Sequence, residues 1–164
     1  MTQFGQDQFG AAKFGGDPTP YLWFEVDAEL TSRARALLAR SVTDGTAIKM
    51  IEFSMGSGGL ELFDYLATVP VNPDAVDLDS PLVPPVVKAI DYYERSNQQS
   101  GCCYCIVDFS EANDLLSEIA IWGTVMWSPR LSEIGMRFCA ALAHFPLVAK
   151  NNSMRYGLRV NVQF

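Results

Sequence analysis

The clearest pattern of hydrophobic and polar positions lies at the end of the chain, in the segment YGLRVNVQF. Five apolar positions alternate there with glycine or polar residues, from Tyr156 to Phe164. Successive side chains of a strand point to opposite faces of a sheet, so this alternation predicts a strand with one buried face. Because Phe164 belongs to the apolar set, we expect the C-terminal end to be part of the sheet.

Similar alternation predicts more strands upstream. The segment VVKAIDYYERS fits a helix or a strand, and its β-branched start and paired tyrosines favour a strand. In GCCYCIVDF, Cys103 and Cys105 would share a face with Val107 and Phe109. The expected strands are Ala47–Met55, Val86–Ser96, Cys103–Phe109, Leu115–Trp122, Gly135–Phe145 and Tyr156–Phe164.

One segment shows helical spacing instead. YLWFEV (Tyr21–Val26) is expected to be extended, and Asp27 then to cap a helix over Asp27–Arg40. The apolar stripe of this helix would be formed by Leu30, Ala34, Leu37 and Leu38. The predicted fold class is therefore α+β and β-rich, with an N-terminal arm and one helix packed on an antiparallel sheet or sandwich.

Two stretches are predicted to be loops. GSGG (Gly56–Gly59) follows a strand, but it lacks the spacing and the lysine of a phosphate-binding loop, so a tight turn is favoured. Thr68–Pro85 contains five prolines, which predicts a long irregular loop on the surface.

The first residues follow neither period. Phe-Gly occurs three times at intervals of five, which matches neither a helix nor a strand. The segment is either a disordered terminus or an arm that becomes ordered on a neighbouring subunit. We expect residues 1–20 to be an extended assembly arm and residues 21–164 to be a single domain. The expected interface residues are Phe4, Phe9, Phe14, Tyr21 and Trp23.

Composition narrows the class of partner. Hydrophobic residues make up 49% and charged residues 19% of the chain. These proportions are typical of a globular domain. The net charge of −7 disfavours a nucleic-acid partner. No apolar run reaches the ~18 residues of a membrane span, so no membrane insertion is expected. The N-terminus has no pattern of a secretory signal, which favours synthesis in a cytoplasm.

Candidate chemistry is sparse. The cysteines are spaced CC and CxC, unlike the pairs of zinc sites, and are interpreted as buried, reduced thiols without a metal or cofactor. His144 is the only histidine and lies on an apolar face, and single acids such as Glu118 are expected to be solvated. The chain is therefore predicted not to be an enzyme. An alternative is a small hydrolase in which Cys139 or Cys103 acts with His144.

Several short motifs together form an ordered series. They are Gly45, Ile48, Met50 and Ile51, then Gly56, Gly58 and Gly59, the proline loop Pro70–Pro85, Asn113–Trp122, Ser132–Met136, Phe138–Lys150 and the last strand. In this order and spacing, residues 30–164 resemble the N-terminal module of phage tail-fibre and tail-collar proteins. Such modules usually continue into a fibre, whereas this sequence ends at Phe164. It also has two Glu-Ile segments where one is expected, and an inserted hairpin at Trp122–Arg130 would explain the second.

The resemblance implies a structural virion protein of a tail baseplate or fibre-attachment site, made in the host cytoplasm. Its partners would be other tail or baseplate proteins and further copies of itself, as a trimer or in sixfold copies. The alternative is a receptor- or glycan-binding module of the tail tip. The aromatic platforms of such a module would be Trp122, Trp127, Tyr92 and Tyr93.

Overall fold

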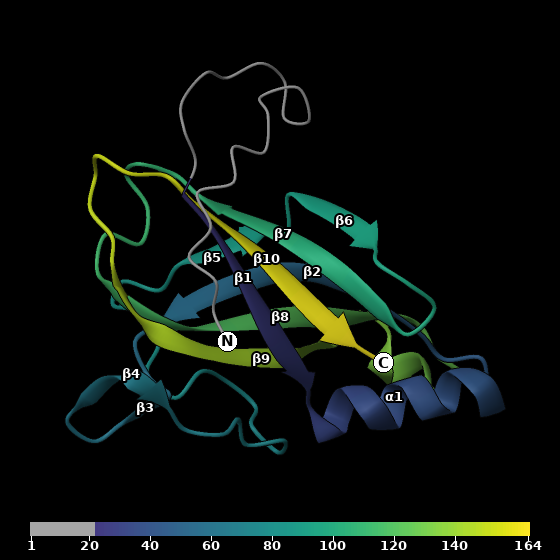
Figure 1. The fold of residues 1–164 in the computed structure, drawn as a ribbon. Helices are drawn as coiled ribbons and strands as arrows, with labels where there is room; N and C mark the ends of the chain where they lie inside the picture. The colour runs from purple at the N-terminus through teal and green to yellow at the C-terminus, as the bar shows by residue number, and fades with distance from the viewer. Residues whose placement is uncertain (1–21) are drawn as a thin grey trace.

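The fold is dominated by one strongly curled mixed sheet (Figure 1). It is seen in a computed structural model that describes residues 22–164. The eight strands, in spatial order, are β5 (Val87–Ala89), β2 (Ala47–Gly56), β8 (Leu115–Trp127), β9 (Arg137–Ala149), β1 (Leu22–Leu30), β10 (Tyr156–Gln163), β7 (Ser100–Val107) and β6 (Tyr92–Arg95). The predicted class, α+β and β-rich, is confirmed.

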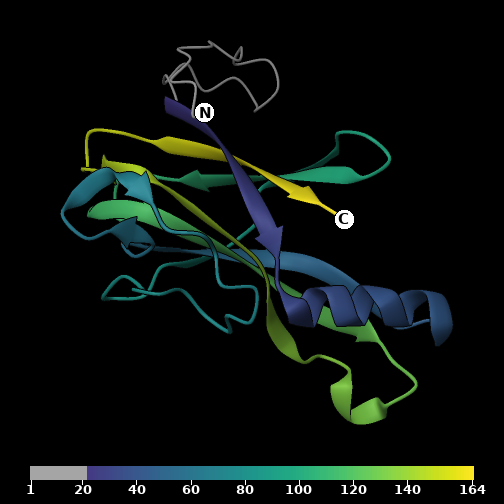
Figure 2. The same ribbon diagram turned by 60° about the horizontal axis from the view of Figure 1, so that its bottom comes forward.

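Strand β1 connects two layers of this sheet. Its first part, from Leu22 to Ala28, pairs in parallel with β10, and Glu29 and Leu30 pair antiparallel with β9. In Figure 2, β1 runs from the layer of β10 and β7 to the layer of β2, β8 and β9. The sheet is antiparallel as predicted except for this one parallel pair, β1 and β10.

The chain crosses from one edge of the sheet to the other between residues 90 and 91. Ile90 donates its backbone N–H to Ile51 of β2, and the next residue, Asp91, donates to Tyr104 of β7. The side chain of Lys88 also reaches the carbonyl of Ile106 at 2.9 Å. Because residues 90 and 91 bond to different layers, the predicted strand Val86–Ser96 is in fact two short strands, β5 and β6.

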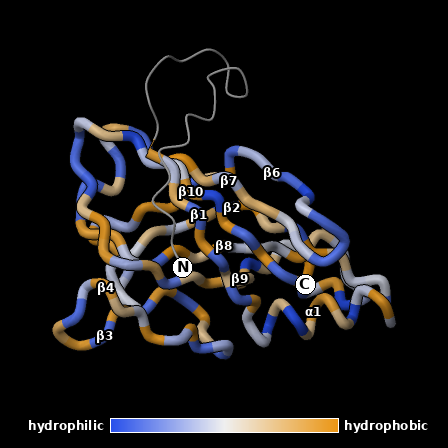
Figure 3. Tube along the Cα trace, viewed as in Figure 1, coloured by the Kyte–Doolittle hydropathy of each residue, from blue (hydrophilic) through white to orange (hydrophobic). Residues whose placement is uncertain are grey.

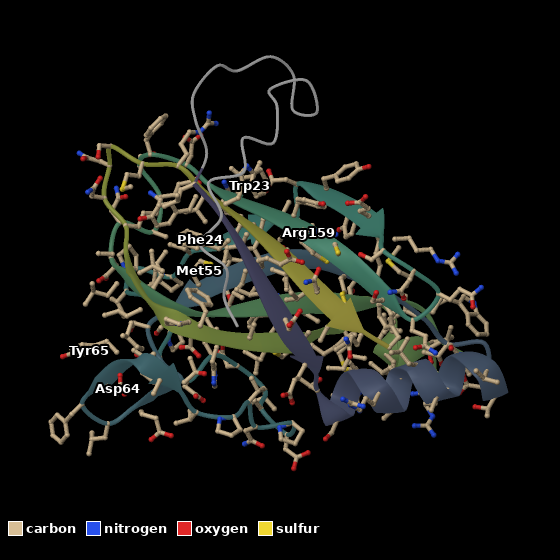
Figure 4. All side chains as sticks on the ribbon, in the orientation of Figure 1. Trp23, Phe24, Met55, Asp64, Tyr65 and Arg159 are labelled. Carbon is tan, nitrogen blue, oxygen red and sulfur yellow. The ribbon has the colours of Figure 1, made fainter. Side chains whose placement is uncertain are left out.

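The main core fills the space between the two layers. Phe24 of β1 and Met55 of β2 both belong to it, and Figure 4 labels them inside the curl. The alternation predicted for the last strand is confirmed, because its four apolar positions inside β10 are all buried. The terminal Phe164 is not, since its exposed fraction is 62%. The buried β10 residues are Tyr156, Leu158, Val160 and Val162.

Helix α1 (Ser32–Thr43) begins later than predicted. Asp27 is not its N-cap, because the alternating burial of β1 continues through Ala28 to Leu30. Thr31 is the N-cap, because its side-chain oxygen accepts a hydrogen bond from a backbone N–H in the first turn of the helix. Its hydroxyl accepts from the Ala34 N–H at 3.2 Å while donating to the Cys139 carbonyl at 2.7 Å. The predicted stripe is confirmed for Ala34 and Leu37, which pack on the main core.

Strands β8 and β9 form one long hairpin. The predicted strand Leu115–Trp122 is too short, because β8 continues to Trp127 before a turn that holds a short 3-10 helix (Leu131–Glu133). The chain therefore has no separate hairpin at Trp122–Arg130, and the second Glu-Ile segment lies in the turn.

Most of residues 57–86 lie against the outer face of this hairpin, whereas Leu82 near their end is buried in the main core. They contain two short strands, β3 (Leu60–Glu61) and β4 (Asp64–Thr68), followed by the irregular proline loop. The loop is not purely superficial as predicted, since Leu78 is buried in a second apolar cluster. That cluster joins Leu78 with Ala120, Trp122, Cys139 and Leu142 on the face of β8 and β9 that points away from the main core.

The described residues contain no helix that is long and apolar enough to cross a membrane.

The central position of β10 gives a first test. Changing Val160→Ala should lower the free energy of unfolding by about 2–3 kcal/mol, because two methyl groups leave a packed core. The matched change Val42→Ala, at an exposed position on α1, should alter it by less than about 0.5 kcal/mol. Urea unfolding followed by circular dichroism measures both. Equal effects of the two changes would show that β10 is not part of the cooperative core.

Candidate interaction hairpin and its polar anchor

The β3–β4 hairpin is the part of the described chain that projects most clearly from the body (Figure 1). Glu61 pairs with Asp64 across the turn, and Leu60 pairs with Thr68. The turn places Phe63 at a φ of 64°. This left-handed conformation costs a bulky residue about 1–2 kcal/mol. Asp64 supports the turn, since its Oδ1 accepts from the Leu66 and Ala67 N–H groups at 3.0 and 3.3 Å.

Large apolar side chains cover this hairpin and are left in solvent. The exposed fractions are 82% for Leu62, 92% for Phe63, 66% for Tyr65 and 77% for Leu66. Figure 3 shows the hydrophobic colour at the tip of the hairpin, and Figure 4 shows Tyr65 pointing outward from it. A cluster of this kind on a protein surface marks a contact site rather than a scattered exposed residue. We call these four residues the hairpin patch.

A buried carboxylate holds the base of the hairpin to the sheet. Glu118 of β8 is 0% exposed, and its two oxygens accept three backbone N–H groups. Oε1 accepts from Gly58 at 3.0 Å and Ser80 at 2.7 Å, and Oε2 accepts from Asp79 at 2.9 Å. Three backbone N–H donors satisfy the hydrogen-bonding needs of a buried carboxylate. Glu118 thereby joins the glycine loop before β3 to the proline loop after β4. The sequence prediction that it is solvated is wrong.

His144 of β9 lies directly opposite Glu118 in the strand pairing. Its side chain is 4% exposed, and its Nδ1 lies 2.8 Å from the carbonyl oxygen of Val69. A carbonyl oxygen only accepts, so Nδ1 carries a proton and donates it. Nε2 then faces Asp79 Oδ2 at 3.5 Å and Glu118 Oε2 at 3.8 Å. We call Glu118, His144 and Asp79 the polar anchor.

The glycine loop is shaped by this anchor. Gly59 has a φ of +76°, and a Cβ there would lie 2.3 Å from the His144 ring. A Cβ on Gly58 would lie 2.7 Å from the Glu118 carboxylate. The prediction of a tight turn is confirmed, and its cause is close contact with two polar side chains. The Gly58 amide that a phosphate would need is already bound to the protein's own carboxylate.

Most of the residues predicted to form an interface lie outside the described part of the chain. These are Phe4, Phe9, Phe14 and Tyr21. Trp23 is described and is partly buried on the outer face of β1, where it packs edge-on against Tyr104 with ring centroids 5.9 Å apart. Its role in an interface remains a prediction.

The aromatic platforms suggested for a glycan site are scattered. Trp122 is buried, donates from Nε1 to the Ser54 hydroxyl at 2.8 Å, and its ring lies 3.8 Å from the guanidinium of Arg137. It cannot be a sugar platform in this fold. Trp127 of β8 and Tyr92 and Tyr93 of β6 are half-exposed, and the two tyrosines are neighbours along one strand.

The cysteines do not form a catalytic pair with His144. All four are buried, and burial raises the pKa of Cys103 and of Cys139 to about 12, so both thiols stay protonated at neutral pH. Cys139 and His144 both lie on β9, five residues apart. Along a strand this is a separation of about 17 Å. The geometry therefore disfavours the cysteine hydrolase.

The sequence carries one signal for the hairpin patch. In LELFDYL, large apolar residues alternate irregularly with acids, which fits no buried face of a strand or helix. The polar anchor has no such signal, because Asp79, Glu118 and His144 are far apart in the chain.

Comparison of the chain with models of known protein families gives no match, and comparison with curated proteins gives no significant match.

The contact between Gly59 and His144 can be tested with a matched pair of glycines. Gly59→Ala should destabilise the fold by about 2–4 kcal/mol, because the cost of the positive φ and the cost of the clash with the imidazole add to each other. Gly135 has a similar φ of +83° but no atom within 4 Å of an added Cβ. For Gly135→Ala only the backbone cost of about 1–2 kcal/mol therefore remains. Denaturant unfolding of both variants gives the difference, and equal losses would exclude the contact.

Proposed function

We propose that this protein is a structural virion protein of a phage tail baseplate or fibre-attachment site. It docks neighbouring subunits through apolar side chains that its own domain does not cover. The observation that carries the proposal is the hairpin patch, in which four large apolar residues of a short hairpin lie in solvent. It would be made in the host cytoplasm and act in the virion.

The size of the patch favours docking in an assembly rather than a strong isolated contact. Full burial of its four side chains would contribute about 6–12 kcal/mol. Loss of translational and rotational freedom on association costs about 4–15 kcal/mol, so the patch alone gives weak binding. Burial of the three phenylalanines of the arm, Phe4, Phe9 and Phe14, on a neighbouring subunit would add about 4–9 kcal/mol. The two together favour stable attachment, which fits an arm that becomes ordered on a neighbour.

The resemblance to tail-fibre modules also supports the proposal. Three of the motif segments that carry it contact one another in the fold: the glycine loop, the Glu-Ile strand and the segment that contains His144. Short motifs that are distant in sequence but meet at one place belong to a single structural unit, the polar anchor.

A groove at the other end of the molecule offers a place for the hairpin of a second copy. It has a volume of about 510 Å³ and is lined by apolar side chains that include Ile48, Met50 and Val162. Its charged lining residues are Lys49, Glu94 and Arg95, two of them basic, whereas Glu61 and Asp64 flank the tip of the hairpin. An apolar projection and an apolar groove with opposite charges fit a head-to-tail contact, which forms a ring when the rotation between subunits closes and an open filament when it does not. Such a contact fits the trimer or sixfold copies implied by the resemblance.

The glycan-binding alternative has one observation in its favour. Tyr92, Tyr104 and Trp23 form a row on the outer face of β6, β7 and β1, with ring centroids 5.6 and 5.9 Å apart. Binding of the purified protein to host envelope would favour this function over assembly.

The role of the patch in assembly can be measured by complementation. A phage that lacks this gene is supplied with tagged wild type, with Phe63→Ser/Leu66→Ser, or with Phe4→Ala/Phe9→Ala/Phe14→Ala. Each variant should enter particles at least about tenfold less well. Each should still melt close to the wild-type temperature, because the altered residues contribute little to the core. Val42→Ser/Leu131→Ser, at exposed positions elsewhere, is the matched control and should be incorporated normally. Normal incorporation of both test variants would contradict the proposal.

The head-to-tail contact can be separated from other contacts by mixing variants. Phe63→Ser/Leu66→Ser removes the projection, and Lys49→Glu/Arg95→Glu reverses the charge of the groove. Each variant alone should remain monomeric at concentrations where wild type associates, whereas the mixture should form dimers, since one intact hairpin meets one intact groove. Light scattering after size-exclusion chromatography measures these masses. Association of either single variant at wild-type concentrations would exclude this pairing.

A further inference from the structure

The polar anchor places three potential metal ligands at one point of the molecule. Asp79, Glu118 and His144 each direct one ligand atom to it, and the three atoms lie within 4.8 Å of one another. We propose that this is a binding site for one divalent transition-metal cation of the zinc type. This inference does not depend on the proposed function.

The distances distinguish a metal site from a simple ion pair. A charged imidazole donates to a carboxylate at about 2.7–2.9 Å. The separations from His144 Nε2 are 3.5 Å to Asp79 and 3.8 Å to Glu118, which are too long for such bonds. Two ligands of a tetrahedral zinc ion, each bonded at about 2.0–2.2 Å, lie roughly 3.3–3.6 Å apart. The Asp79 separation lies in this range and the Glu118 separation lies just beyond it.

The histidine is oriented as a metal ligand. Its Nδ1–H donates to the carbonyl of Val69 at 2.8 Å. This bond holds the ring so that Nε2 faces the two carboxylates, and such a second bond of the ring is typical of histidines that bind metals. Nε2 thus faces two carboxylate oxygens in a site that buries the imidazole, and a bound cation would offset the negative charge of the two carboxylates.

Among the described residues, no lysine or arginine supplies a positive charge to the two carboxylates. Among residues 22–164, neither Asp79 nor Glu118 forms an ion pair with a lysine or arginine. Glu118 has no exposed side-chain surface, whereas the Asp79 side chain is 53% exposed. The site is thus closed on the side of the sheet and open on the side of Asp79, where a cation enters and water completes its coordination. One nitrogen and two oxygen ligands suit zinc better than magnesium or calcium, which prefer oxygen alone.

The test uses the full, untagged chain, freed of metal by chelation and dialysis. Titration calorimetry with Zn²⁺ should give one site per chain, and Mg²⁺ or Ca²⁺ at the same concentrations should bind far more weakly. Asp79→Asn should weaken zinc binding by at least about tenfold. Because the Asp79 side chain is exposed and makes no hydrogen bond in the described structure, this variant should fold as wild type. Asp74→Asn, an exposed acid in the same loop, is the matched control and should bind zinc unchanged.

Thiols also bind zinc, so a second readout identifies the ligand. His144 is the only histidine of the chain, and its ring nitrogens can therefore be followed by NMR without ambiguity. Stoichiometric zinc should shift the Nε2 resonance and leave Nδ1 protonated, in wild type and in Asp74→Asn. Unchanged His144 resonances at saturation, or equal zinc affinity of wild type and Asp79→Asn, would overturn the proposal.

Discussion

The double pairing of β1 is the constraint on which the rest of the fold depends. A strand that pairs in parallel with β10 and, from the next residue on, antiparallel with β9 must pass from one layer of the sheet to the other. The curl that results lets the inner faces of both layers share one apolar core and brings side chains of the edge strands β5 and β6 within hydrogen-bonding distance of the opposite layer. Helix α1 follows directly from the end of β1, so its position is fixed by the same crossing.

This curl leaves the outer face of β8 and β9 to be covered by another part of the chain. Residues 57–86 do so with few regular hydrogen bonds of their own. Two interactions hold them against the sheet. One is the small apolar cluster around Leu78 and Trp122. The other is the carboxylate of Glu118, which supplies acceptors to amides that would otherwise be unsatisfied near the sheet. A loop held at its base in this way can present a projecting hairpin in a defined direction.

The hairpin patch and the polar anchor therefore form one structural arrangement. The side chains at the tip are unfavourable in solvent, and the backbone at Phe63 is strained, while the base is bound firmly to the sheet. Exposed apolar surface on a rigid support suits a contact with a preformed partner surface, because little ordering entropy is lost on binding.

Local pattern by itself determined the strand character of β2, β7 and β10, the apolar stripe of α1 and the irregular course of the proline loop. These features depend on side-chain periodicity and on proline, which act over a few residues. Periodicity also indicates the end of β1, since its alternation continues to Leu30, but Asp27 resembles a helix cap and displaces the predicted boundary.

Tertiary structure alone decided the parallel pairing of β1 with β10, the division of Val86–Ser96 into two strands, and the burial of Glu118. Each depends on a partner that is distant in the chain: Arg159 opposite Glu25, the carbonyls of Ile51 and Tyr104, and amides 38 to 60 residues away. Sequence indicates which groups need a partner, but the register of distant strands decides which partner is within reach. For the same reason Glu118 and His144, each unremarkable in its own segment, meet only when β8 and β9 pair.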